Sequence, residues 1–211
     1  MSTTALSATA ALARLREGNA RFVAGDNTLT SPASKERRLE LVDGQNPMAV
    51  ILSCSDSRAP AELIFDQGLG DLFVIRVAGN VVAPSQVGSV EYAASALGTR
   101  LVVVMGHTHC GAVAATVDAI NNPAAESTRN IASIVDRIRP AVQPLLAAGV
   151  TDRELLLRQA MHTNVSMSAN HLRHGSALLE NLLVDGGLRV VGAAYDIESG
   201  IVSFFDGVEG L

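Results

Sequence analysis

Two cysteines and a histidine stand where they could share a metal ion. Cys54 directly follows an apolar run at 48–53, and His107 and Cys110 directly follow a second run at 101–106. Thiolate sulfur and imidazole nitrogen suit zinc, and three protein ligands leave a fourth position open, as catalytic zinc sites do. Cysteines of an intracellular protein are more often plain buried residues. Their place at strand ends beside polar residues nevertheless favours a metal site.

A charged pair lies close to the first of these cysteines. Asp56 and Arg58 follow Cys54 in the run Cys-Ser-Asp-Ser-Arg. An arbitrary Asp-x-Arg pair is usually a solvated surface ion pair of little energetic value. Beside a metal ligand, the Asp56 carboxylate can instead become a fourth ligand or accept a hydrogen bond from metal-bound water. Whether Arg58 holds the carboxylate away from the metal decides between these roles.

The apolar runs that carry these residues indicate a parallel sheet. The runs 48–52, 72–77 and 101–105 are short and continuous, which is typical of strands buried on both faces. A helical face over 87–97 separates the second run from the third, so strand, helix and strand suggest a right-handed crossover. Ligand sites gather at the carboxyl ends of parallel strands. We therefore expect the cysteines and the histidine to meet in one crevice.

The rest of the chain continues this alternation, which predicts one α/β domain over residues 1–211. Residues 1–35 should form a helical arm, from about residue 8 to Gly25, followed by a loop over 27–35. A capping box at Thr151 and Glu154 predicts a long helical stretch to residue 183 with a break near Gly175. The remaining elements are helices over 112–120 and from 131 to a stop at Pro140, and strands over 188–194 and 201–205.

Composition excludes several classes of function. The 211 residues are 48% hydrophobic and 18% charged, with a formal net charge of −5, so we expect no nucleic-acid partner. No apolar stretch approaches the length of a membrane span and no signal peptide is evident, which favours a cytoplasmic protein without a membrane partner. Two cysteines are too few for a disulfide scaffold, although they leave one bridge possible.

The segments Cys-Ser-Asp-Ser-Arg at 54–58 and Gly-His-Thr-His-Cys-Gly at 106–111 resemble the active-site signature of the β-class carbonic anhydrases. The resemblance runs from about residue 17 to residue 206. It implies one zinc ion per chain, bound by Cys54, His107 and Cys110. It also implies an α/β fold with a parallel core sheet, and a homodimer that can pair into a tetramer, with the arm at residues 1–35 at the dimer interface.

The same resemblance implies a mechanism: zinc-bound hydroxide attacks carbon dioxide and yields bicarbonate. Asp56 and Arg58 would form a dyad that orients the hydroxide, with Asp56 on the metal only in a closed state. Two thiolates cancel the formal charge of zinc, so activity should rise toward alkaline pH. Gln45 is implied to be a third catalytic residue, which hydrogen-bonds the substrate oxygen. The residues implied to line the substrate pocket beside Gln45, in part across the dimer interface, are Phe73, Ala78 and Tyr92.

One departure from the family bears on regulation. Some members close their site when bicarbonate binds a pocket of Trp, Arg and Tyr. Arg76 and Tyr195 match two of these positions, but Ile51 stands at the Trp position. Bicarbonate gating of that form is therefore not expected.

Two other functions remain open beside carbon dioxide hydration. One is hydrolysis of carbonyl sulfide or carbon disulfide at the same zinc site, and the other is a non-catalytic zinc scaffold with Asp56 as a permanent ligand. His109 is left unassigned, with a part in proton transfer open. For His162, His171 and His174, packing at a surface or an interface is the preferred interpretation.

Overall fold

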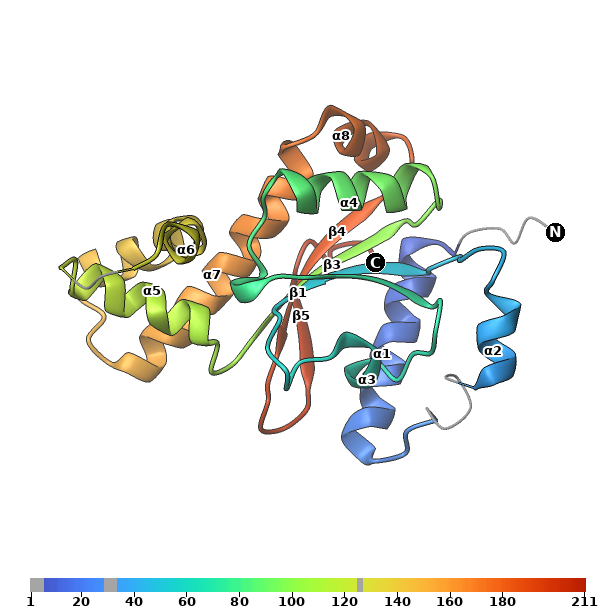
Figure 1. The fold of residues 1–211 in the computed structure, drawn as a ribbon, viewed down its shortest axis with the longest axis horizontal. Coiled ribbons are helices and arrows are strands. Elements are labelled where there is room, and N and C mark those ends of the chain that lie inside the picture. Colours follow the sequence, from blue (N-terminus) through green and yellow to red (C-terminus); the bar gives the residue numbers. More distant parts are fainter. Residues whose placement is uncertain (1–5, 29–33, 125–126) are drawn as a thin grey trace.

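A single five-stranded sheet organises the chain in the computed structural model, which describes residues 6–28, 34–124 and 127–211 (Figure 1). The strands lie in the order β2-β1-β3-β4-β5, with the first four parallel and β5 antiparallel to β4. The predicted parallel core is confirmed. The strands are β1 (Ala49–Ser53), β2 (Leu72–Arg76), β3 (Leu101–His107), β4 (Arg189–Tyr195) and β5 (Val202–Asp206).

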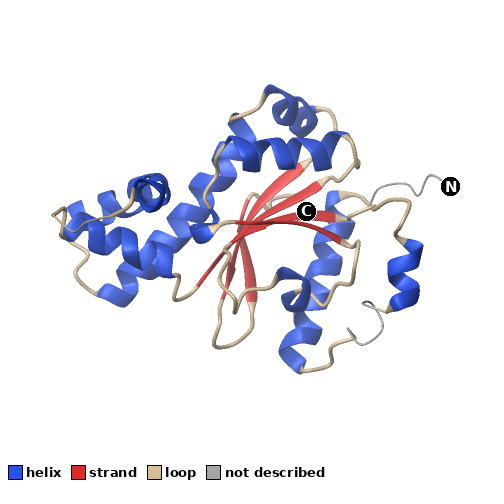
Figure 2. Ribbon diagram, in the orientation of Figure 1, coloured by secondary structure: helices blue, strands red, loops and turns tan. Residues whose placement is uncertain are grey.

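Helices cover both faces of this sheet (Figure 2). Side chains alternate along each strand, so Val50 and Leu52 of β1 enter one apolar core while Ala49 and Ile51 enter the other. Helices α4, α5, α6, α7 and α8 border the first core, and α1 and α3 border the second. The helices are α1 (Ala8–Ala24), α2 (Lys35–Glu40), α3 (Ala61–Ile64), the 3-10 turn η1 (Ala78–Asn80), α4 (Pro84–Ser95), α5 (Gly111–Asn121), α6 (Arg129–Ala147), α7 (Arg153–His174) and α8 (Ala177–Val184).

Helix α1 packs on its own chain. Ser7 caps its start, Gly25 ends it in a left-handed conformation, and Leu12 and Leu15 are buried in the second core. Gly18 passes so close to α3 that a Cβ atom at this position would lie 1.8 Å from the Phe65 carbonyl oxygen. The apolar face of the expected arm is thus already covered by its own sheet, and a contact of α1 with a second subunit remains a prediction.

Two predicted helix boundaries were wrong. Helix α6 does not stop at Pro140 but continues through it to Ala147, because Ala141 and Val142 carry the buried face onward past the proline. Helix α7 is capped by Asp152, whose carboxylate accepts a hydrogen bond from the Leu155 amide at 2.7 Å, and not by Thr151. The predicted break near Gly175 is confirmed. Of the predicted loop at 27–35, residues 29–33 lie outside the described part of the chain.

In the described part of the chain, no helix combines the length and apolar character that crossing a membrane requires. Helices α5 and α6 and the first half of α7 pack together as a lobe that projects from one end of the sheet (Figure 1).

Candidate metal centre

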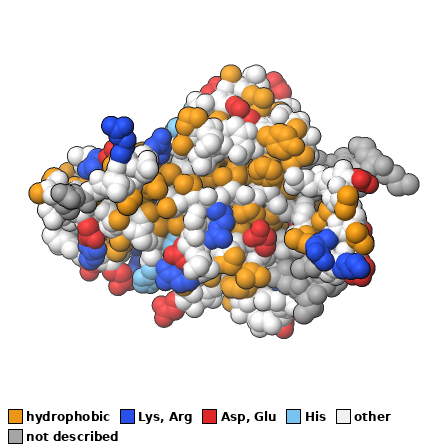
Figure 3. Space-filling model, in the orientation of Figure 1, with side chains coloured by type: hydrophobic (Ala, Val, Ile, Leu, Met, Phe, Trp, Pro, Cys, Tyr) orange, Lys and Arg blue, Asp and Glu red, His pale blue; other side chains and the backbone are white. Residues whose placement is uncertain are grey.

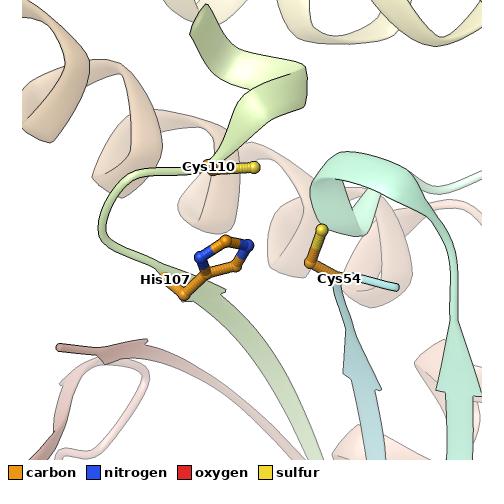
Figure 4. A group of neighbouring side chains, drawn as sticks. All are labelled: Cys54, His107 and Cys110. Carbon is orange, nitrogen blue, oxygen red and sulfur yellow. The ribbon is translucent and has the colours of Figure 1, made fainter. Parts of the chain in front are cut away.

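The carboxyl ends of β1 and β3 bring the three predicted metal ligands together. β1 and β3 are parallel neighbours, so Cys54 after β1 lies beside His107 at the end of β3, and Cys110 follows after a tight turn. The candidate ligand atoms all lie within 4.8 Å of one another and the three residues are buried. Figure 4 shows both sulfur atoms and one edge of the imidazole ring turned toward a common space.

The backbone sets the tautomer of the histidine. His107 Nδ1 lies 2.8 Å from the carbonyl oxygen of Thr108. A carbonyl can only accept a hydrogen bond, so Nδ1 carries the proton and Nε2 presents a lone pair. Nε2 is buried and has no hydrogen-bond partner. Such an unpartnered nitrogen facing two sulfurs is what a metal-binding imidazole requires.

The two thiols do not form a disulfide, and each changes the acidity of the other. Both cysteines are free and buried. The neighbouring Cys110 thiol outweighs burial and, together with the Gly79 amide, lowers the pKa of Cys54 to about 4. The same bond, together with burial, raises the pKa of Cys110. The cluster therefore holds a thiolate at neutral pH, which favours a soft divalent cation.

These donors fit zinc. Two sulfurs and one nitrogen form the ligand set that zinc accepts in a tetrahedral shell, and a buried Nε2 without a partner is left for it. Among the described residues no other group of His, Cys, Asp or Glu side chains is close enough to hold a metal. Three protein ligands leave one position for water or substrate.

Asp56 and Arg58 form a two-pronged ion pair beside the cluster. Arg58 Nε lies 3.0 Å from Asp56 Oδ1, and Arg58 Nη2 lies 2.8 Å from Oδ2. Asp56 Oδ2 is also 3.9 Å from His107 Nε2, which places the carboxylate at the edge of the ligand cluster. The Arg58 guanidinium holds the pKa of the Asp56 carboxyl far below its usual range. The carboxylate is thus ionised, close to the ligands and held to one side by the arginine.

Arg76 braces the loop that carries this pair. Its Nε donates to the Cys54 carbonyl at 3.0 Å and its Nη2 to the Asp56 carbonyl at 2.5 Å. The other two positions of the family's bicarbonate pocket are occupied by Ile51, which is fully buried, and Tyr195, which is nearly so. Arg76 therefore fixes the backbone from Cys54 to Asp56 in this structure, which gives it a use independent of any bicarbonate pocket.

The remaining predicted substrate residues divide into two groups. Ala78 lies next to Gly79, whose amide donates to Cys54 Sγ at 3.3 Å, so Ala78 is near the cluster. Gln45 precedes β1 and therefore lies at the opposite end of that strand. Phe73 pairs with Val50 near the same end and packs on Tyr92, with ring centroids 6.2 Å apart.

Gln45, Phe73 and Tyr92 are consequently not brought to the metal ligands of their own chain. The strand between Gln45 and Cys54 alone spans roughly 13 Å, at about 3.3 Å per residue. Gln45 is exposed, and Tyr92 has 52% of its surface exposed. They lie on the surface beside the edge strand β2.

The other four histidines do not belong to the cluster of candidate ligands. His109 is exposed and has a positive φ of 58°, while its carbonyl accepts a 3.4 Å hydrogen bond from Arg58. His162 packs on Phe205 with ring centroids 4.5 Å apart, as a packing role predicts. His171 and His174 are exposed at the end of α7.

Two contributors to the site escaped the sequence analysis. The first is Gly79, whose amide donates a hydrogen bond to the Cys54 sulfur. The second is Thr108, whose amide donates to the Tyr195 carbonyl and whose hydroxyl accepts from the Ile197 amide, so that it links the end of β3 to the end of β4. Gly79 acts through its backbone amide, which leaves no residue-type pattern in the sequence. The one signal at position 79 is the glycine itself, because its left-handed φ of 69° is unfavourable for other residues.

Comparison with known proteins identifies relatives of this fold and site. Residues 49–202 match the family model described as carbonic anhydrase. The chain is 39% identical over 191 residues to carbonic anhydrase 2 of Mycobacterium tuberculosis, covering 90% of this chain and 89% of that protein. It is 39% identical over 193 residues to a carbonic anhydrase of Mycolicibacterium smegmatis, covering 92% and 91%.

A solved structure gives the same result. The crystal structure of the β-carbonic anhydrase CafA of the fungal pathogen Aspergillus fumigatus superimposes with a TM-score of 0.74 at 28% identity, covering 95% of this chain and 91% of that chain. The similarity therefore extends over nearly the whole fold.

Proposed function

The chain belongs to the β-class carbonic anhydrases, and we propose that it hydrates carbon dioxide reversibly to bicarbonate and a proton, using one zinc ion per chain. The observation that carries this proposal is the convergence of Cys54, His107 and Cys110 around an unpartnered His107 Nε2. Bound zinc would supply the nucleophile by making a water molecule more acidic than it is in bulk solvent. Two buried free thiols suit a reducing compartment, so we place the protein in the cytoplasm.

Asp56 and Arg58 would aim the attack. The Asp56 carboxylate is ionised and 3.9 Å from His107 Nε2, so it can accept the hydrogen bond of the attacking O–H group and leave an oxygen lone pair facing the substrate carbon. Arg58 keeps Asp56 charged and turned aside from the ligands. This pairing favours a catalytic site over a metal scaffold in which Asp56 is a permanent ligand.

The rest of the substrate pocket would come from a second copy of the chain. Gln45, Phe73 and Tyr92 lie too far from their own ligand cluster but share the surface near β2 and α4. Figure 3 shows hydrophobic side chains gathered in a band across this face, between α4 and the edge strand. The half-buried or exposed apolar side chains here are Phe73, Ile75, Val77, Val87 and Tyr92. We propose that a homodimer, which can pair further into a tetramer, covers this band.

Stopped-flow measurement of carbon dioxide hydration, on protein of known zinc content, tests the activity directly. We expect activity in proportion to zinc, at about one ion per chain, and a rate that rises from about pH 6.5 to 9. The rate should rise with pH because two thiolates cancel the formal charge of the zinc ion. Water bound to such a site is less acidic than in a three-histidine site, where its pKa is about 7. Bound zinc without hydration at the upper pH would refute the proposal.

A site shared between subunits makes a separate prediction about Gln45. Gln45→Ala should lower kcat/KM on the order of 100-fold, since one polar group on the substrate oxygen is lost. Co-expression of Gln45→Ala with Cys54→Ser should restore about a quarter of wild-type activity, because half of randomly formed dimers are mixed and each has one complete site. Gln143→Ala, an exposed glutamine on α6, is the matched control. Wild-type kcat/KM in Gln45→Ala would place Gln45 outside the site, and mixed protein no more active than its parents would exclude a site shared between subunits.

A further inference from the structure

We propose that Asn164 and Ser168 of α7 are positioning residues of the metal centre, which hold the turn η1 so that the Gly79 amide stays on the Cys54 sulfur. The inference rests on the proposed zinc site and adds to it a support from a helix that contributes no ligand. It concerns how the sulfur is held, and is therefore testable without a hydration assay.

The turn that η1 makes is conformationally costly. Gly79 has a φ of 69° and Asn80 a φ of 44°, so two successive residues occupy the left-handed region. For Asn80, a residue with a side chain, this region is unfavourable, and such backbone persists only where its surroundings enforce it. The conformation points the Gly79 amide at Cys54 Sγ, at 3.3 Å.

Helix α7 supplies much of that enforcement. Asn164 Nδ2 donates to the Gly79 carbonyl at 2.8 Å, and Ser168 Oγ donates to the Asn80 carbonyl at 3.1 Å. The two side chains are four residues apart and therefore share one face of the helix. Both are buried, with 2% and 6% of their surfaces exposed. Two successive carbonyl groups of the turn are thus each held by a buried donor.

The opposite side of the turn is closed by apolar contact. A Cβ atom at position 79 would lie 2.5 Å from Ile138 Cδ1 and 3.0 Å from Ala112 Cβ. A side chain at position 79 would therefore clash with α6 and α5, which leaves the turn little room on that side. Asn164 and Ser168 therefore hold the turn in a position that packing already limits.

The hydrogen bond from Gly79 has a chemical consequence for Cys54. An N–H group directed at sulfur fixes the direction of the sulfur lone pairs that a metal would accept. If the turn relaxes, Cys54 becomes a less well-oriented ligand. Outer contacts of this kind typically change metal affinity about 10- to 100-fold.

Zinc affinity and a cobalt spectrum test the inference. In competition with a chromophoric chelator, Asn164→Ala and Ser168→Ala should each bind zinc about 10- to 100-fold more weakly than wild type. With Co²⁺ in place of zinc, the sulfur-to-metal charge-transfer band should move to lower energy, because a thiolate without its N–H donor is easier to oxidise. Ser168→Thr keeps the hydroxyl and should restore both properties.

Thr163→Ala is the matched control on the same helix, since its hydroxyl bonds only within α7, to the Gln159 carbonyl at 2.9 Å. Wild-type affinity and an unmoved cobalt band in both alanine variants would overturn the inference, and so would equal effects in Thr163→Ala. If Asn164→Ala does not fold, the Ser168 pair decides alone. Wild-type protein that binds zinc but does not hydrate carbon dioxide would overturn the proposed function and leave this inference standing; wild-type protein that binds no zinc would overturn both.

Discussion

Cys54→Ser is expected to lose bound zinc and to lower carbon dioxide hydration on the order of 1,000-fold or more, because the metal generates the nucleophile. A serine hydroxyl is not ionised at neutral pH and cannot replace a thiolate whose pKa is lowered to about 4. The measurement is zinc per chain by elemental analysis, together with stopped-flow hydration on the same sample.

The fold of this variant should persist, because serine is nearly the size of cysteine. With a chelator present, Cys54→Ser and wild type should unfold at similar temperatures, whereas added zinc should raise the unfolding temperature of wild type only. His107→Ala and His174→Ala form a second matched comparison, since His174 is exposed and outside the cluster. A Cys54→Ser protein that keeps full zinc and activity would disprove the ligand assignment.

Arg58→Ala should lower kcat/KM about 100-fold or more while zinc stays bound, in contrast to Cys54→Ser. The substitution removes both guanidinium hydrogen bonds to Asp56. The pKa of Asp56 should then rise toward the ordinary value of about 3.9, so the carboxylate stays ionised at neutral pH. Protonation therefore does not explain the loss. The freed carboxylate, already 3.9 Å from His107 Nε2, would move onto the metal and occupy its open position.

The double variant Arg58→Ala with Asp56→Asn distinguishes two causes of the loss in activity. One is that the Asp56 carboxylate blocks the open position on the metal, and the other is that the nucleophile is no longer oriented. If blocking dominates, the double variant should be more active than Arg58→Ala alone, since an amide is a poorer ligand than a carboxylate. Arg137→Ala is the control, because Arg137 lies on the exposed side of α6 and its guanidinium donates to the Ser133 carbonyl within that helix. Wild-type kcat/KM in Arg58→Ala would exclude a catalytic Asp-Arg dyad.

The clustering of the candidate metal ligands was predictable because two local signals coincide. Apolar runs predict parallel strands, and parallel strands align their carboxyl ends, which is where Cys54 and His107 stand.

The continuation of helix α6 through Pro140 was not predictable in this way. Pro140 is a strong stop signal locally, but the buried residues that follow it keep α6 helical, since tertiary packing outweighs local preference.

The positions of Gln45 and Tyr92 show another limit. Their family resemblance predicts a part in the substrate pocket, yet their place in the fold sets them far from their own ligands. Sequence spacing describes one chain and carries no record of which surface a second copy covers. The Asn164 contact escaped prediction for a different reason: a side chain that bonds to a backbone carbonyl imposes no residue type on its partner.

The spacing of the ligands along the chain also affects when a metal can be captured during folding. Cys54 follows β1 and His107 ends β3, so no short peptide of this chain contains the complete ligand set. β1 and β3 must pair before sulfur and nitrogen come within reach, and pairing of residues far apart in the chain is slow. Zinc would therefore select chains whose central sheet is already assembled, and metal uptake would report the completion of folding rather than initiate it.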